Sequence, residues 1–167
     1  MPNDASTDLD STDLETWAAF ATVLEWLPPA LDHPLTRDFD LTHFEYGILY
    51  ALAGAPERTL RMSVLAGYSN SSLSRLSRAV SRLERRDWMR RSPDPDDGRS
   101  TLATITDAGL ERFEQATPGH VQTLHRLVFD RLTATQKRQL REISRRISTA
   151  IREEEGWQPP VSAKRPA

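Results

Sequence analysis

Apolar residues recur at helical spacing along most of this chain, and the first such run predicts an amphipathic helix. Its apolar positions are Leu14, Trp17, Phe20, Ala21, Leu24 and Leu27. Thr12 and Glu15 have the spacing of a capping box, in which each side chain bonds an exposed amide of the first turn. Pro28-Pro29 is expected to kink or end the helix, because proline lacks an amide hydrogen and clashes with the preceding turn.

A second capping box opens at Thr42, with Glu45 three residues later, and predicts a helix that runs to about Ala53. Gly54 and Pro56 are expected to close this helix. The apolar residues that it would bury are Phe44, Ile48, Leu49 and Leu52.

Residues 59–61 are predicted to form a short strand, and residues 62–66 a short helix that Gly67 ends. The helix that follows has Ser69 or Asn70 as its expected cap. Its apolar stripe consists of Leu73, Leu76, Val80 and Leu83. A different face, aligned by the same three- and four-residue spacings, carries Arg75, Arg78 and Arg82.

A β-hairpin is predicted next, because residues 88–91 and 101–105 alternate between apolar and polar side chains. The segment between the two strands, Pro93–Arg99, is built from turn residues and places Arg99 at its tip. Two more helices follow the hairpin. Thr106 caps the first, which is expected to bend at Pro118-Gly119.

The last helix opens with a third capping box, Thr133 to Gln136. Its apolar stripe is Leu140, Ile143, Ile147 and Ile151. The complete order is helix, helix, short strand, helix, helix, hairpin, helix, helix. It predicts a mainly α fold with a small β-hairpin, in which the middle is a winged helix-turn-helix. The apolar stripes of the outer helices can cover each other within one chain or between two chains.

Charge is distributed unevenly along the chain. It has 22 basic and 24 acidic residues, a net charge of −2. Residues 57–99, however, contain ten arginines against six acidic residues, a local charge of +4. A basic patch on an acidic body directs an anionic partner to one face, and arginine binds phosphate or guanine with two parallel hydrogen bonds.

Several functional classes are excluded or disfavoured by what the sequence lacks. The absence of cysteine excludes disulfides and thiolate metal sites. No apolar run approaches the ~20 residues that cross a bilayer, and the acidic N-terminus lacks a signal core, so we expect a cytoplasmic protein without a membrane partner. No catalytic set or glycine-rich phosphate loop is recognisable, so we expect no enzyme and no cofactor. We expect no metal site, because the spacings of the four histidines do not suit ligands on one helix. They are His33, His43, His120 and His125.

The arginine-bearing helix and the hairpin together predict an interface for duplex DNA. Ser74, Arg75 and Arg78 are candidates for reading bases in a major groove. Ser77, Arg82 and Arg85 are expected nearer the phosphates. Arg91 and Arg99 extend the set into the hairpin, with Arg99 in a minor groove. Asp97 is expected to bond the side chain of Arg99 or Arg91 and aim it outward. The alternatives are a solvated arginine face and an ordinary acidic turn.

The same residues resemble the MarR (multiple antibiotic resistance regulator) family over about residues 12–155. The specific part is the wing motif Asp94-Pro95-x-Asp97-x-Arg99 with the trailing Thr106-Asp107-Ala108-Gly109. Further likeness lies in Leu65-Ala66, Arg82-Leu83-Glu84, Trp88, Arg91, Leu41-Thr42 and Phe44 to Leu49. One departure is Asp87, which stands where family members usually have glycine; aspartate tolerates a positive φ better than most residues.

The resemblance implies a homodimer joined through its first and last helices, in which each subunit offers one winged helix to half of a pseudo-palindromic operator. It also implies a repressor that a small phenolic or anionic effector releases. The chain then divides into a DNA-binding lobe, dimerisation helices and loose ends. The DNA-binding lobe spans residues 55–105, and the dimerisation helices span 12–53 and 106–155, so that 11–155 forms one domain. The loose ends are residues 1–10 and 156–167. A winged-helix module that binds an acidic protein is the alternative function.

Aromatic residues on the first and second helices are candidates for lining an effector pocket. The set is Trp17, Phe20, Trp26, Phe44, Tyr46 and Tyr50. His33 and Arg37 are candidates for holding an anionic ligand there. Aromatic residues at helical spacing also form ordinary cores, and His33 and Arg37 are equally compatible with a solvated loop.

Overall fold

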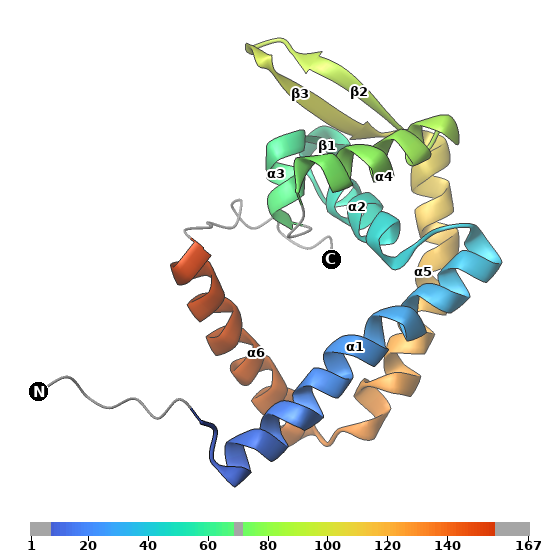
Figure 1. Cartoon of the computed structure of the whole chain (residues 1–167). Helices are drawn as coiled ribbons and strands as arrows, with labels where there is room; N and C mark the ends of the chain where they lie inside the picture. The colour runs from blue at the N-terminus through green and yellow to red at the C-terminus, as the bar shows by residue number, and fades with distance from the viewer. Residues whose placement is uncertain (1–7, 69–71, 156–167) are drawn as a thin grey trace, which may run out of the picture.

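The computed structural model describes residues 8–68 and 72–155, and its order of elements is the predicted one (Figure 1). The bounds of the α-helices are α1 Ser11–Phe39, α2 His43–Ala53, α3 Met62–Tyr68, α4 Leu73–Arg85, α5 Asp107–Leu127 and α6 Ala134–Glu155. The strands are β1 Thr59–Arg61, β2 Met89–Asp94 and β3 Asp97–Ile105, and two short 3₁₀ helices are η1 Pro56–Arg58 and η2 Phe129–Arg131. The predicted tails fall largely outside the described residues.

The middle of the chain is a winged helix-turn-helix. Its three strands form an antiparallel sheet in the order β1-β3-β2, with Leu60 opposite Ala103 and Arg91 opposite the same Ala103. Helices α2, α3 and α4 cluster beside the base of this sheet, and the β2–β3 hairpin projects beyond them (Figure 1). The predicted fold class, mainly helical with a winged helix-turn-helix, is therefore confirmed.

The core lies where α2, α3 and α4 meet the sheet. Its fully buried aliphatic side chains are Leu41, Ile48, Leu49, Leu52, Leu65, Leu76, Val80 and Leu83. Each contributes about 1.5–3 kcal/mol relative to an exposed side chain. The predicted apolar stripe of α4 is thus confirmed at three positions, whereas the side chain of Leu73 lies outside the description.

Helix α1 differs from its prediction in its N-terminal cap and in its length beyond Pro28-Pro29. Its cap is Asp10, whose carboxylate accepts from the Asp13 amide at 2.8 Å, and not Thr12. Pro28-Pro29 does not end it either, since the helix continues through both residues to Phe39. Beyond the prolines, α1 packs against α5 and buries Leu31 and Leu35. This packing outweighs the lost backbone hydrogen bonds, because tertiary burial routinely overrides local propensity.

The end of α3 and the start of α4 also differ from their predictions. Helix α3 runs to Tyr68, so Gly67 does not end it. The cap of α4 is Ser72, whose hydroxyl accepts from the Arg75 amide at 3.3 Å. The expected caps Ser69 and Asn70 lie outside the described residues.

The remaining caps agree with the sequence. Thr42 and Glu45 form a reciprocal capping box at the start of α2. Thr106 caps α5, and Thr133 and Gln136 exchange the two predicted hydrogen bonds before α6. These signals are local, because each involves residues only three positions apart.

Asp87 occupies the turn between α4 and β2 with a φ of 57°, the left-handed conformation that its position suggested. The amide of Trp88 donates back to the Leu83 carbonyl at 3.0 Å and that of Asp87 to the Glu84 carbonyl at 2.9 Å. This pattern closes a helix through a left-handed residue, the role that glycine usually fills. An aspartate can take it because it visits this region more readily than most side chains.

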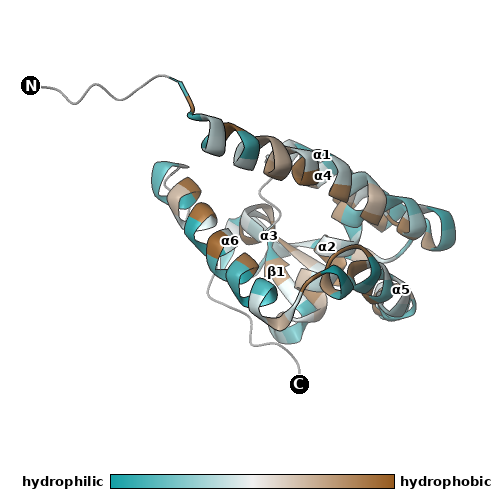
Figure 2. Ribbon diagram, turned by 90° about the horizontal axis from the view of Figure 1, so that it is seen from below, coloured by the Kyte–Doolittle hydropathy of each residue, from teal (hydrophilic) through white to brown (hydrophobic). Residues whose placement is uncertain are grey.

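Two helices carry most of the exposed apolar side chains of the described residues. In the first half of α1 these are Leu14, Trp17, Phe20, Val23, Leu24 and Trp26, and in α6 they are Leu140, Ile143, Ile147 and Ile151. Apolar segments recur along both helices in Figure 2, while α6 diverges from the winged helix in Figure 1. Exposed stripes of this size mark surfaces that bind another apolar surface. Over the described stretches, 8–68 and 72–155, no helix is long and apolar enough to cross a membrane.

Candidate nucleic-acid interface

The exposed face of α4 lies opposite its buried stripe. Leu76, Val80 and Leu83 point into the core, and a period of 3.6 residues places Ser74, Arg78 and Arg85 on the other side of the helix. The side chains of Ser74, Arg78 and Arg85 are exposed. Two of the three, Ser74 and Arg78, are predicted base-reading residues, and this face is the part of α4 that is free to enter a groove.

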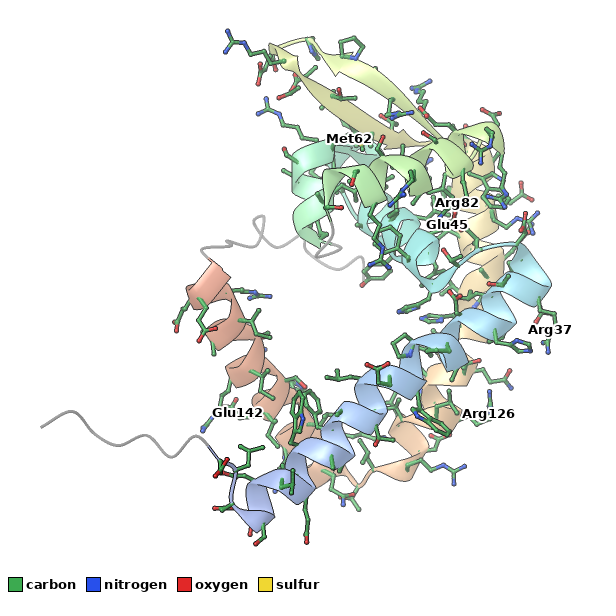
Figure 3. All side chains as sticks on the ribbon, in the orientation of Figure 1. Arg37, Glu45, Met62, Arg82, Arg126 and Glu142 are labelled. Atoms are coloured by element: carbon green, nitrogen blue, oxygen red, sulfur yellow. The ribbon has the colours of Figure 1, made fainter. Side chains whose placement is uncertain are left out.

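Arg75 and Arg82, which were expected beside Arg78, turn instead toward α2. The guanidinium carbon of Arg75 lies 4.7 Å from the centre of the Phe44 ring. The Nε of Arg82 donates to the Glu45 carboxylate at 2.7 Å, and Figure 3 shows these two side chains meeting between α4 and α2. Arg75 and Arg82 are therefore engaged with α2, whereas Arg78, on the same side of the helix, is exposed.

The hairpin is bonded to α4 through Arg91. Its Nε donates to the Glu84 carboxylate at 3.0 Å, and its backbone amide donates to the same carboxylate at 2.9 Å. Its guanidinium also donates to the hydroxyls of Ser77 at 3.2 Å and Ser81 at 3.1 Å. Two predicted site residues, Ser77 and Arg91, are thus brought together, and they join the wing to the helix.

The turn of the wing is tighter than the sequence suggested. It consists of Pro95 and Asp96, so Arg99 lies on β3 and not at the tip, with its side chain exposed. Asp97 accepts from the backbone amide of Arg99 at 3.2 Å and from the Ser100 hydroxyl at 2.7 Å. The hydrogen bond from Ser100 is the main cause that lowers the pKa of Asp97. Asp97 therefore fixes the backbone at Arg99 and does not bond the side chain of Arg99 or Arg91 as predicted.

An ion pair close to the turn of the wing was not predicted. The Nε of Arg61, on β1, donates to the Asp94 carboxylate at 2.7 Å, and Asp94 is buried. The other Asp94 oxygen accepts from the amide of Asp96 at 3.0 Å. Asp94 was identified only as part of a motif, because no local signal connects it with a residue on another strand.

Half of the ten arginines between residues 57 and 99 are paired with acidic side chains. The pairs are Arg58–Asp107, Arg61–Asp94, Arg82–Glu45, Arg86–Asp40 and Arg91–Glu84. Within the part of the chain that the structure describes, no such pair is seen for the other five, Arg75, Arg78, Arg85, Arg90 and Arg99, of which Arg75 lies over the Phe44 ring. The exposed members of this second group are the cations available to an anionic partner.

An open pocket of about 530 Å³ lies between α1 and α5, away from the wing. His33 and Arg37, the two residues predicted to hold an anion, line it together with Asp38, His120 and Arg126. Figure 3 shows Arg37 and Arg126 on the same side of the molecule. Arg37 donates to Asp38 through two bonds of 2.7 Å, so its charge is partly satisfied, and the bond to Asp38 is the main cause that raises the pKa of Arg37.

The aromatic residues predicted for an effector pocket do not line this one. Trp17, Phe20 and Trp26 are exposed on the first half of α1. Tyr46 is buried against Phe113, with ring centres 5.2 Å apart. The remaining two are Phe44, which lies under Arg75, and Tyr50, which is exposed and contacts Phe113 edge-on. Helical spacing does not distinguish a core or interface aromatic from a pocket aromatic, so an effector role for these six residues stays a prediction.

Two histidines lie together between α2 and α5. The ring centres of His43 and His120 are 5.4 Å apart, and the Nδ1 atom of each is buried with no hydrogen-bond partner among the described residues. Burial lowers the pKa of both imidazoles, and Asp32, whose carboxylate accepts from the His43 amide at 2.6 Å, partly opposes this for His43. The neighbouring Tyr46 has its pKa raised, also mainly by burial. Both histidines are therefore favoured in the neutral form.

Comparison with known proteins agrees with this geometry. A sequence profile described as the MarR family matches residues 39–100. The crystal structure of Sco3205 from Streptomyces coelicolor, a MarR family transcriptional regulator in complex with DNA, is similar with a TM-score of 0.85 and 40% identity, over 89% of this chain and 92% of that one. The chain belongs to the MarR family.

More distant relatives are known from sequence. The HTH-type transcriptional regulator YdcH of Bacillus subtilis is 32% identical over 85 residues, which are 48% of this chain and 56% of YdcH. The transcriptional repressor MprA of Escherichia coli is 27% identical over 103 residues, which are 62% of this chain and 58% of MprA. The matched region of this MarR-family chain thus spans somewhat more than half the length of each.

The Thr106-x-x-Gly109 part of the MarR-family resemblance has a packing explanation. The Thr106 hydroxyl donates to the Asp87 carbonyl at 2.6 Å and accepts from the Gly109 amide at 3.0 Å. A Cβ on Gly109 would lie 1.9 Å from the carbonyl oxygen of Trp88. Only glycine lets α5 begin this close to the end of α4, which fixes the root of the wing.

Proposed function

We propose that this MarR-family chain is a sequence-specific DNA-binding regulator of transcription without enzymatic activity. The observation that carries the proposal is the exposed face of α4, with Ser74, Arg78 and Arg85, next to a wing that exposes Arg99. An α-helix of this width fits a major groove, and arginine can bond both acceptors of a guanine edge. The likeness to Sco3205, solved with DNA, supports the same role.

The contacts divide according to what the fold leaves free. Arg78 reads a base and Ser74 contacts a base or phosphate, because both are exposed near the outward line of α4. Arg85 contacts the backbone. Arg99 reaches the adjacent minor groove, while Ser77 and Arg91 act by holding the wing against α4. Asp97 supports Arg99 through its backbone only.

The regulator acts as a homodimer. The apolar stripe of α6 and the exposed aromatic residues of α1 leave too much apolar surface uncovered in one copy, and a second copy covers both. In this division, residues 12–53 and 106–155 supply the dimer interface, and residues 55–105 supply the DNA-binding lobe. Two recognition helices then meet half-sites about one helical turn apart, roughly 34 Å.

The regulator represses, and a small phenolic or anionic molecule releases it. The likeness to the repressor MprA supports repression. The pocket between α1 and α5 supports a small-molecule ligand, since Arg37, Arg126 and His33 line it together with the buried His120. The dimer would have one arrangement whose spacing matches the two half-sites and one whose spacing does not. A ligand in this pocket needs only to bind the second arrangement more tightly than the first. A thermal-shift screen of phenolic and planar anionic compounds, repeated with Arg126→Ala, tests this assignment.

The experiment that tests the central proposal is a binding titration with the DNA upstream of the protein's own gene. The labelled fragment should be bound at least ~10³-fold more tightly than scrambled DNA of equal length, the lower end of specific recognition. Equal affinity for both fragments would contradict sequence-specific binding. Retention of an acidic protein with no DNA binding would favour the protein-interaction alternative.

A further inference from the structure

Two arginines of α4 and the arginine at its C-cap form a line on the side of the helix that faces α1 and α2. Arg75, Arg82 and Arg86 are seven and four residues apart, so they fall within one narrow stripe. Each contacts a group of the α1–α2 junction: the ring of Phe44, the carboxylate of Glu45 and the carboxylate of Asp40, respectively. We name this set of contacts the arginine seam.

The central contact of the arginine seam is the most constrained. Glu45 is 2% exposed, and its Oε1 accepts from the Arg82 Nε at 2.7 Å. Its other oxygen accepts from the amide and the hydroxyl of Thr42, both at 3.0 Å. One buried carboxylate therefore caps α2 and holds α4, so α4 cannot rotate without breaking a charge-assisted bond.

The third contact anchors the end of α4. Asp40 ends α1 in the left-handed conformation, with a φ of 54°, and its carboxylate accepts from Arg86 at 2.8 Å. The arginine seam thus spans three turns of α4 and fixes its direction relative to two other helices.

We propose that Arg82 and Glu45 are positioning residues that set the orientation of α4, and that Arg82 is not a DNA contact. The inference rests on the proposed DNA-binding function. The Arg82 side chain is 41% exposed, but its charge is already balanced by the Glu45 carboxylate, so Arg82 adds little net attraction for a phosphate. A small rotation of α4, in contrast, would displace Arg78 from a base edge. Base readout is geometrically demanding, whereas general phosphate attraction is not.

The test measures binding of Arg82→Met to the upstream operator and to random DNA across a range of salt. We expect the ratio of the two affinities to fall about tenfold, the discrimination that one misplaced bidentate contact carries. Affinity for random DNA should stay within about twofold, and its salt dependence should not change, because no phosphate contact is lost.

Arg82→Met leaves Glu45 charged and buried, which destabilises the fold. The double variant Arg82→Met/Glu45→Gln removes this charge, leaves an amide that can still cap α2, and should show the same loss of discrimination. Thr42→Val is the matched control: it weakens the cap but keeps the Arg82–Glu45 pair, so thermal stability should fall with the affinity ratio unchanged. Arg85→Met removes an outward arginine of the same helix and should weaken binding to both DNAs.

Two results would overturn the inference while the wild type still discriminates. One is a uniform loss on both DNAs with a salt slope lower by about one unit in Arg82→Met, which identifies a phosphate contact. The other is an unchanged ratio in both Arg82 variants. A wild type that does not discriminate operator from random DNA overturns the proposed function itself.

Discussion

The guanidinium of Arg91 on β2 is bonded to the carboxylate of Glu84 on α4, with 3.0 Å between Nε and Oε2. This pair joins the wing to the helix that carries Arg78. The hydroxyls of Ser77 and Ser81 strengthen the joint by accepting from the same guanidinium. Contacts made by the helix and the wing on DNA should therefore be interdependent.

Arg78→Ala tests base readout. The side chain is exposed and lies close to the outward line of α4. Its loss should reduce discrimination between operator and random DNA by about 1–3 kcal/mol, the value of one bidentate contact to guanine. Fluorescence anisotropy with both DNAs measures this difference. Equal losses on the two would show that Arg78 contacts phosphate.

Arg99→Ala tests the wing. Arg99 is exposed on β3, and its backbone is fixed by the bond from its amide to Asp97. The variant should bind the operator more weakly and lower the slope of log affinity against log salt by about one unit. Arg58→Ala, which removes an arginine already paired with Asp107 at the start of α5, is a suitable control and should leave the slope unchanged. A minor-groove role for Arg99 is refuted by wild-type affinity and slope.

Ile147→Glu tests the dimer. Ile147 lies in the middle of the exposed apolar stripe of α6, and a charge there cannot be buried without a partner. The wild type should sediment as a dimer at micromolar concentration, and the variant should shift toward monomer. Thr149→Ala, on the opposite side of α6, should remain dimeric. A wild type that stays monomeric contradicts the proposed interface.

Gly109→Ala tests the root of the wing. The added methyl group would lie 1.9 Å from the Trp88 carbonyl oxygen, which neither backbone can relieve without moving. Overpacking of this kind costs about 1–3 kcal/mol in the free energy of unfolding. Gly47→Ala is the control, because nothing lies within 4 Å of its added carbon and a helical alanine should stabilise by about 0.5–1 kcal/mol. Thermal or denaturant unfolding distinguishes the two variants.

The histidine pair predicts a dependence of stability on pH. Burial lowers the pKa of His43 and His120 below the ordinary 6.5 in the folded state, so the unfolded chain binds more protons as the pH falls. Their contribution to stability is complete above pH 6.5 and is lost as the pH falls below it. His120→Phe should make the free energy of unfolding less sensitive between pH 7.5 and about 5.5. Identical pH profiles for variant and wild type would contradict this.

Local signals predicted much of the fold. The capping boxes at Thr42 and Thr133 and the apolar stripe of α4 depend on residues within a few positions of one another. The continuation of α1 through Pro28-Pro29 could not be predicted from local signals, because it depends on contacts with α5. Helix propensity describes an isolated segment, whereas this segment is held by packing.

The candidate site was predictable in composition but not in detail. The sequence indicated which arginines share the segment, yet the acid that pairs with Arg82 lies 37 residues away and the one that pairs with Arg61 lies 33 residues away. Such pairs form only after the chain has folded. Arg75 and Arg82 were therefore assigned to DNA by their spacing, although their contacts are with Phe44 and Glu45.

The ion pairs that involve half of the arginines in residues 57–99 also determine the electrostatic potential of the protein at long range. A paired arginine contributes a short-range dipole and no net charge, so the winged helix projects a weaker positive potential than its arginine content suggests. Long-range attraction to DNA of arbitrary sequence should then be modest. A regulator of this kind is retained mainly where the shape and base edges of the duplex match its few unpaired cations.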